Sequence, residues 1–149
     1  MKILLAIDDS KFSEAAIQAV ARQMNPEQAE VCILHIVEPL LLVPEFRAGD
    51  LEGIKSTEQL LCKHGEQLVA RAEQSLRKAG FKVHTVVKEG DHRAEIIDHA
   101  AEWGAELIVL GSHGRRGLDR FLMGSVAEFV SRHAACSVEI VRMPETKRS

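Results

Sequence analysis

Five short apolar runs are spaced along the chain, and each is followed by a polar residue or ends in glycine. They occupy residues 2–7, 30–37, 82–87, 105–111 and 137–141. Their length and their content of Val, Ile and Leu predict β-strands. The first, second and fourth runs are almost continuously hydrophobic, which is typical of strands that are covered on both faces, as in a parallel sheet.

Between these runs, apolar residues recur at the 3.6-residue spacing of amphipathic helices. Two serines mark predicted helix starts, because Ser56 with Gln59 and Ser125 with Glu128 match the capping-box pattern. The periodic apolar residues are Phe12, Ala16, Ala19 and Val20; Leu61, Leu68, Val69, Ala72 and Leu76; Ile97, Ala100 and Ala101; and Val126, Phe129 and Val130.

Strands and helices therefore alternate along the chain, and Gly80 and Gly104 stand where helix C-caps belong. This order predicts a single-domain, doubly wound α/β fold: a parallel five-stranded sheet with right-handed crossovers and helices on both faces. The longest irregular segment, residues 38–55, contains two prolines and two glycines. We interpret it as a lid or contact surface, with disorder as the alternative. The domain is expected at residues 1–143, with a frayed C-terminal tail at residues 144–149.

The bulk composition narrows the class of protein. The chain has 149 residues, of which 46% are hydrophobic and 28% are charged, enough for one soluble domain with a core. A net charge of -3 and a pI near 6.2 give no overall basic field, so we expect neither nucleic acid nor a membrane as partner. The first apolar run meets Asp8 too early for a signal-peptide core or a membrane span, which favours the cytoplasm. Cys32, Cys62 and Cys136 have no C-x-x-C spacing and lie in apolar segments, so we expect buried free thiols.

Two strand exits carry the residues with the most promising chemistry. In an open parallel sheet, ligands bind at the carboxyl ends of the strands, where the winding reverses direction. The first strand ends at Asp8, Asp9 and Ser10, and the fourth ends in a glycine-rich loop that begins at Gly111. We therefore expect both exits to border one crevice.

The loop and the helix start that follows it, residues 111–126, have the spacing G-x2-G-x9-G-S, with Gly111, Gly114, Gly124 and Ser125 at the marked positions. Glycine permits a positive φ and a close approach of phosphate to the backbone, and a helix N-terminus favours an anion. The spacing matches neither the Walker A loop nor the Rossmann fingerprint. From the residues alone, a phosphate-binding loop and a glycine-rich turn with an ordinary cap both remain open.

Three arginines lie in the same loop, at positions 115, 116 and 120. They are interpreted either as cations that neutralise a bound phosphate or as a solvated loop face.

The segments ELIVLGSHGRRGLDRFLMGSVAEFV, KILLAIDDSKFSEAAIQAV and ILHIVEP resemble the universal stress protein (UspA) family in its nucleotide-binding branch, over nearly the whole chain. The resemblance implies a Rossmann-like fold of the adenine nucleotide alpha hydrolase type. It also implies that ATP or a related adenine nucleotide, such as AMP or cyclic AMP, is bound, with Mg²⁺ accompanying the phosphates. A homodimer paired through the C-terminal strand, which regulates another protein through direct contacts during stress, is the further implication.

The resemblance also assigns residues to the nucleoside end of the site. Asp8 corresponds to the acid that hydrogen-bonds the ribose, and Ala6, on the same face of the strand, would border the base. The backbone of Ile36 would read adenine. Leu110 and Gly111 would flank the ribose.

The phosphate end is assigned in the same way to the loop and the helix that follows it. Gly114 and Gly124 would shape the loop. The hydroxyl of Ser125 and the amide of Val126 would bind phosphate oxygens. The two residues expected to reach the phosphates from within the loop are His113 and Arg115.

The sequence departs from the family pattern at three positions. Asp9 stands where glycine is frequent, and a second carboxylate near the ribose would oppose phosphate unless a cation intervened. Ser137 replaces a usual proline, and Glu139 interrupts the last strand, either disturbing the dimer geometry or guarding an exposed edge.

Several of these polar residues have simpler explanations. Asp8 follows a strand and is in position to cap the next helix, although Ser10 can do so instead. His35 is expected to be a satisfied core or strand-end histidine and not a ligand. His92 and His99 share one face of a predicted helix, but no third ligand lies nearby, so we assign no metal.

We predict no catalytic residues, because the chain has no G-x-S-x-G elbow, no H-E-x2-H motif and no evident water-activating acid. Slow ATP hydrolysis is the most that this pattern supports. The leading hypothesis is a nucleotide-dependent stress regulator. The alternatives are a dimeric interaction scaffold of the same fold, in which Asp9 blocks the site, and a weak ATPase or phosphotransferase.

Overall fold

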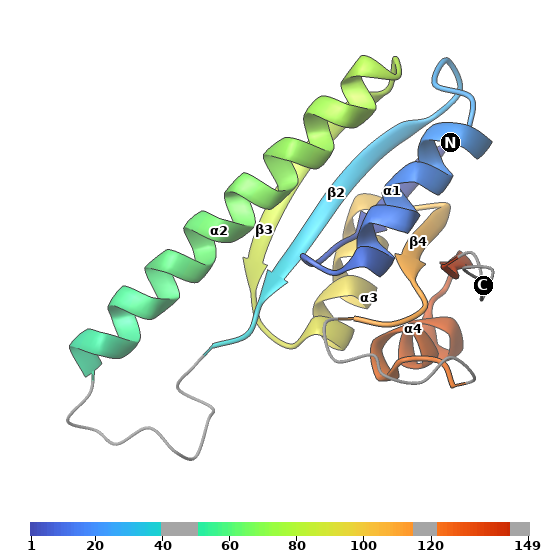
Figure 1. Cartoon of the computed structure of the whole chain (residues 1–149). Coiled ribbons are helices and arrows are strands. Elements are labelled where there is room, and N and C mark those ends of the chain that lie inside the picture. Colours follow the sequence, from blue (N-terminus) through green and yellow to red (C-terminus); the bar gives the residue numbers. More distant parts are fainter. Residues whose placement is uncertain (40–50, 115–121, 144–149) are drawn as a thin grey trace, which may run out of the picture.

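Five parallel strands form one sheet in the order β3-β2-β1-β4-β5, and helices cover it on both faces (Figure 1). This computed structural model describes residues 1–39, 51–114 and 122–143. The predicted doubly wound α/β fold is confirmed. The elements are β1 (Lys2–Ala6), α1 (Lys11–Gln23), β2 (Glu30–Val37), α2 (Leu51–Lys78), β3 (Lys82–Glu89), α3 (His92–Trp103), β4 (Leu107–Gly111), α4 (Ser125–His133) and β5 (Ser137–Val141).

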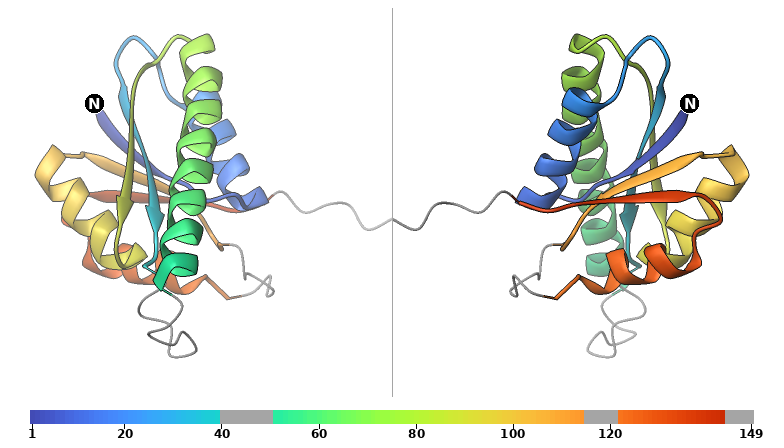
Figure 2. Two further views of the ribbon diagram at one scale, coloured as in Figure 1. Left: turned by 90° about the vertical axis from the view of Figure 1, so that its left-hand side faces the viewer. Right: turned by 90° about the vertical axis from the view of Figure 1, so that its right-hand side faces the viewer.

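The helices lie in two layers, with α1 and α2 on one face of the sheet and α3 and α4 on the other (Figure 2). Successive residues of β1 point to opposite faces. Ile3 and Leu5 pack into the core shared with α1 and α2, whereas Leu4 and Ala6 pack toward α3 and α4. Because both faces are covered, β1 and β2 are hydrophobic at almost every position.

The strand order places the reversal of winding beside β1. The chain moves outward from β1 through β2 to β3, then returns to add β4 and β5 on the other side. The connections after β1 and β4 therefore leave the carboxyl edge on opposite faces of the sheet, which opens a crevice between them. The register Ala6↔Leu110 brings the two exits side by side, as predicted.

The start of α2 corrects one predicted boundary. The helix begins at Leu51, so Ser56 lies inside it and caps nothing, and the irregular segment predicted at residues 38–55 is shorter. Ile54, in the first turn of α2, is 3% exposed. Residues 40–50 lie outside the described part of the chain, so the predicted lid is not tested.

The predicted C-cap at Gly104 is confirmed: it ends α3 in the left-handed conformation, at φ 76°. On the inner face of α3, Ile96 and Ala100 are the buried residues, whereas Ala101 is exposed. The expectation for Ala101 was wrong because the helix is turned so that Ile96 faces the sheet.

Candidate functional site

A cleft of about 910 Å³ opens at the carboxyl edge of the sheet. It is bordered by the ends of β1, β2 and β4, the starts of α3 and α4, and one side of α2. Arg115 lies outside the described residues. The predicted site residues that line the cleft are Ala6, Asp8, Ile36, Leu110, Gly111, His113, Gly114, Gly124, Ser125 and Val126.

Asp8 is held firmly at the exit of β1. Its Oδ1 accepts hydrogen bonds from the backbone N–H of Ser10 and from the hydroxyl of Ser13, both at 2.8 Å. Ser13 in turn accepts from the backbone N–H of Asp8 at 2.8 Å. Of the two possible caps, Ser10 and not Asp8 caps α1, by accepting from the Ser13 backbone N–H at 3.3 Å. The Asp8 carboxylate therefore does not cap α1, and Asp8 lines the cleft.

The two ends of the glycine-rich loop are joined at its base. The backbone N–H of Gly124 donates to the Ser112 carbonyl at 2.7 Å. The His113 ring contacts the Leu122 carbonyl through Nε2, and its Nδ1 lies 3.1 Å from the Ser112 hydroxyl. The same ring packs against Phe12 of α1, with 5.1 Å between ring centroids. His113 thus fastens the loop to α1 and to the segment before α4.

The loop glycines are required for space. Positive φ angles were expected here, but among the described glycines they occur only at Gly80, Gly90 and Gly104. A Cβ on Gly111 would lie 2.7 Å from the Phe12 Cβ, and a Cβ on Gly124 would lie 3.0 Å from the Ser112 carbonyl oxygen. The first turn of α1 and the base of the loop leave no room for side chains.

The helix N-termini around the cleft differ in how they are capped. Ser10 caps α1, and Asp91 caps α3 by accepting at 3.0 Å from the N–H groups of Arg93 and Ala94. Helix α4 begins after Gly124, which provides no side-chain cap. The predicted capping box at Ser125 is wrong, because Ser125 is the first helical residue. Among the described residues, no side chain caps the first N–H groups of α4, so an anion in the cleft can accept from them.

The hydrogen bond from Ala94 N–H, with the nearby Arg93 guanidinium, holds the pKa of Asp91 below its ordinary value. The N-terminus of α3 is thus already occupied by a carboxylate of the protein itself. Of the three described caps, those of α1, α3 and α4, only that of α4 contributes no side-chain hydrogen bond.

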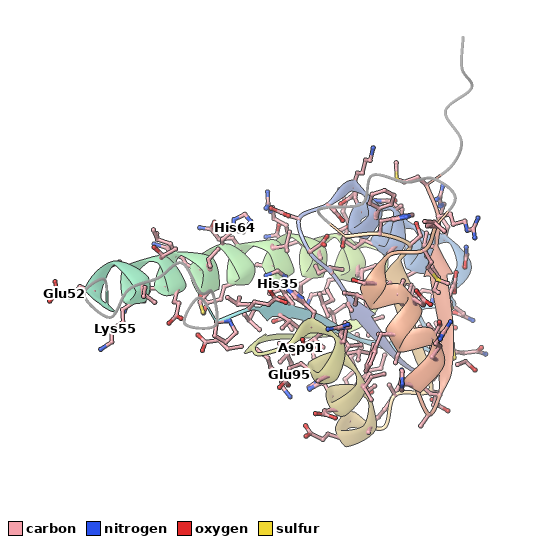
Figure 3. All side chains as sticks on the ribbon, turned by 90° about the horizontal axis from the view of Figure 1, so that it is seen from below. His35, Glu52, Lys55, His64, Asp91 and Glu95 are labelled. Atoms are coloured by element: carbon pink, nitrogen blue, oxygen red, sulfur yellow. The ribbon has the colours of Figure 1, made fainter. Side chains whose placement is uncertain are left out.

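Residues of α2 and α3 complete the far wall of the cleft. Figure 3 looks onto the carboxyl edge and shows His35 between His64 of α2 and Asp91 at the start of α3; all three line the cleft. His35 is 7% exposed and donates from Nδ1 to the Ile7 carbonyl at 2.8 Å, which confirms it as a satisfied core histidine. The other residues that sequence reasoning missed on this side are Leu61, Glu38, Pro39, His92 and Ile96. Leu61 and His64 reach the cleft through the tertiary packing of α2, whereas Glu38 and Pro39 follow β2, and His92 and Ile96 belong to the start of α3.

Asp9 turns toward α2 and is not among the residues that line the cleft. Its Oδ2 lies 3.5 Å from the His64 Nε2. The carboxylate expected to crowd the ribose is therefore engaged with a histidine. Within the described lining, the acidic residues are Asp8, Glu38 and Asp91, and neither lysine nor arginine is present.

The remaining histidines and thiols have separate surroundings. The Nε2 of His92 lies 3.7 Å from Glu38, and that of His99 lies 3.5 Å from the Cys32 Sγ. Across the described ranges, no group of three or more His, Cys, Asp or Glu is arranged to hold a metal ion. All three thiols are free, as predicted, but only Cys32 is buried; the others are half-buried. Burial raises the pKa of Cys32 to about 11.

The outermost strand on the β4 side is β5, where the half-buried Glu139 lies opposite Val109. In the part of the chain that the structure covers, no helix combines the length and apolarity needed to cross a membrane.

Comparison with known sequences identifies a family. The model of the universal stress protein family matches residues 1–142. The universal stress protein YxiE of Bacillus subtilis is 32% identical over 145 residues, which cover 95% of this chain and 98% of that protein. Universal stress protein MJ0531 of Methanocaldococcus jannaschii is 33% identical over 144 residues, covering 97% and 83% respectively.

Solved structures share the fold. The structure of MJ0577 from M. jannaschii superposes with a TM-score of 0.86 at 26% identity, covering 97% of both chains. A universal stress protein in complex with cAMP gives a TM-score of 0.67 at 20% identity, covering 95% of this chain and 96% of that one. A family member from Arabidopsis thaliana with AMP bound gives 0.69 at 16%, covering 99% and 94%. The fold, the switch-point cleft and the match over nearly the full length agree, and the chain belongs to the universal stress protein family.

Proposed function

We propose that this protein binds ATP or a related adenine nucleotide, such as AMP or cyclic AMP, in the cleft at the carboxyl edge of its sheet. The observation that carries the proposal is the uncapped N-terminus of α4, which opens into the cleft beside the Ser125 hydroxyl. Helix N–H groups and a hydroxyl bind phosphate oxygens without requiring a cationic side chain. This suits a cleft whose described lining contains neither lysine nor arginine.

The nucleoside half of the ligand is assigned to the ends of β1, β2 and β4. Ala6 and Ile36 would border the base, Leu110 and Gly111 would flank the ribose, and Asp8 provides an acceptor for a sugar hydroxyl. Support comes from the two relatives of the same fold solved with cAMP and AMP. Mg²⁺ would arrive with the phosphates and offset their charge near the acidic lining.

In the cytoplasm, nucleotide binding in the cleft would change the contacts that this protein makes with another protein. Leu122 and Met123 line the cleft next to Gly124 and are 68% and 40% exposed, so a bound phosphate and a docking protein would meet the same segment. We assign no catalytic residue.

The edge strand β5 would pair with a second copy, and light scattering would then give twice the chain mass of 16.5 kDa.

Mass spectrometry of gently purified protein, followed by calorimetry with ATP and Mg²⁺, tests nucleotide binding. We expect wild type to bind and Gly124→Val to lose at least about 10-fold in affinity, since a side chain there collides with the Ser112 carbonyl. Gly53→Val is the matched control, because nothing lies within 4 Å of a Cβ at that position. No binding by wild type, or equal binding by Gly124→Val, would refute the proposal.

A further inference from the structure

The two oxygens of Asp8 have different surroundings. Oδ1 accepts from the Ser10 backbone N–H and the Ser13 hydroxyl, both at 2.8 Å. Oδ2 accepts no hydrogen bond from the described residues, and a Cβ built on Gly114 would lie 3.0 Å from it. One oxygen is therefore held by the protein, and the other faces the cleft toward Gly114.

Ser13 creates this asymmetry. Its hydroxyl donates to Oδ1 of Asp8 and accepts from the backbone N–H of the same residue, also at 2.8 Å. These two bonds close a ring between the backbone and the side chain of Asp8, which restrains rotation of the carboxylate. Ser13 is 6% exposed, so solvent hardly competes for its hydroxyl. Its single proton is used within the ring and is not available to a ligand.

We propose that Ser13 is a positioning residue that fixes Oδ2 of Asp8 as the acceptor for one sugar hydroxyl, and that the cleft thereby selects ribonucleotides over deoxyribonucleotides. The inference rests on the proposed nucleotide binding. An ionised carboxylate only accepts hydrogen bonds, so its ligand partner at Oδ2 has to be a donor. A sugar that lacks this hydroxyl leaves a partly buried charged oxygen without a partner, which is selected against more strongly than a missing apolar contact.

Gly114 keeps the approach to Oδ2 open. The residue is exposed, and its φ is not among the positive values in the described chain, so alanine fits the backbone there. The added methyl group would instead stand 3.0 Å from Oδ2. Gly114→Ala thus disturbs the same oxygen from the opposite side without touching Ser13.

Calorimetry with ATP, 2′-deoxyATP and 3′-deoxyATP at saturating Mg²⁺ measures the selectivity of the full chain. For wild type, we expect at least one deoxynucleotide to bind about 10-fold or more weakly than ATP. Ser13→Ala and Gly114→Ala should each reduce this ratio to about 3-fold or less. Ser10→Ala is the matched control for Ser13→Ala. It removes the side chain that caps α1 but keeps the Ser10 backbone N–H, which donates to Oδ1 of Asp8. Gly53→Ala is the control for Gly114→Ala, and both controls should keep the wild-type ratio.

The ratio separates positioning from general loss of stability, because a destabilised fold weakens ATP and its deoxy analogues equally. Equal affinity of wild type for all three nucleotides, or an unchanged ratio in both Ser13→Ala and Gly114→Ala, overturns the inference while nucleotide binding stands. If Ser13→Ala does not fold, Ser13→Cys takes its place and should also lower the ratio, because a thiol is only a weak donor and acceptor. Failure of wild type to bind any of the three refutes the proposed function itself.

Discussion

Glycine meets two different physical needs in this chain. At Gly104 the backbone takes a left-handed conformation that ends α3, which a local sequence pattern can predict. At Gly111 and Gly124 the need is space, set by Phe12 of α1 and by the Ser112 carbonyl. Gly65 belongs to the second kind, although it lies inside a helix: a Cβ there would stand 2.6 Å from the His35 Cδ2.

Replacing Gly65 should therefore test close packing under the cleft. We expect Gly65→Ala to lower the free energy of unfolding by about 1 kcal/mol, because overpacking at about 1–3 kcal/mol exceeds the gain in helix propensity of about 1 kcal/mol. The His35 ring cannot easily retreat, since it is buried and bonded to the Ile7 carbonyl. Urea denaturation gives the measurement. In the control, Gly53→Ala has open space around the new methyl group and should stabilise the protein by up to about 1 kcal/mol, so two changes of the same sign would contradict this account.

At the scale of elements, helix starts decide where an anion is accepted. Helices α1 and α3 cap themselves with Ser10 and Asp91, and α4 does not cap itself. The sequence pattern around Ser125 resembles a cap, yet the helix begins one residue earlier than the capping box requires. A structure was needed to distinguish these cases, since a shift of one residue moves the hydroxyl from the cap into the first turn.

The cap of α3 gives a pH-dependent prediction. Asp91→Ala should lower the free energy of unfolding by about 1 kcal/mol at neutral pH through loss of the cap. Hydrogen bonding holds the pKa of folded Asp91 below the ordinary 3.8, so its carboxylate stabilises the fold above that pH. The benefit is lost as the pH falls through the folded pKa. Urea titrations from neutral pH down to about pH 3 should show the gap between wild type and Asp91→Ala closing.

Asp91→Asn is the control for charge, because asparagine retains a capping oxygen but does not ionise. Its stability relative to Asp91→Ala should stay nearly constant over the same range. A gap between wild type and Asp91→Ala that widens toward acid pH would contradict the assignment of the cap.

At the scale of the whole molecule, the cleft joins elements from both helix layers. Asp8 and Ser13 belong to the β1–α1 side, Ser125 starts α4, and His64 lies on α2. A ligand that contacts several of these elements binds the folded chain and not the unfolded one. Binding should therefore stabilise the fold globally.

Nucleotide-linked unfolding tests this coupling. With ATP and Mg²⁺ at about 100 times the dissociation constant, the free energy of unfolding should rise by about 2.7 kcal/mol. Chemical denaturation with and without nucleotide measures the change, and Gly124→Val with a 10-fold weaker affinity should gain no more than about 1.4 kcal/mol at the same nucleotide concentration. Tight calorimetric binding without any increase in stability would mean that the ligand does not depend on the folded cleft.

The sequence alone determined the order of strands and helices, the sheet class and the two exits at Asp8 and Gly111, because apolar periodicity and strand hydrophobicity are local properties of the chain. The family resemblance supplied the individual site residues, and the fold brings those that the structure describes together in one cleft. Arg115 lies outside the described residues. Tertiary structure decided the rest. It brought α2 to the cleft, turned Asp9 toward His64 and placed Oδ2 of Asp8 beside Gly114. Each of these outcomes depends on contacts between segments far apart in the chain, and no local pattern contains them.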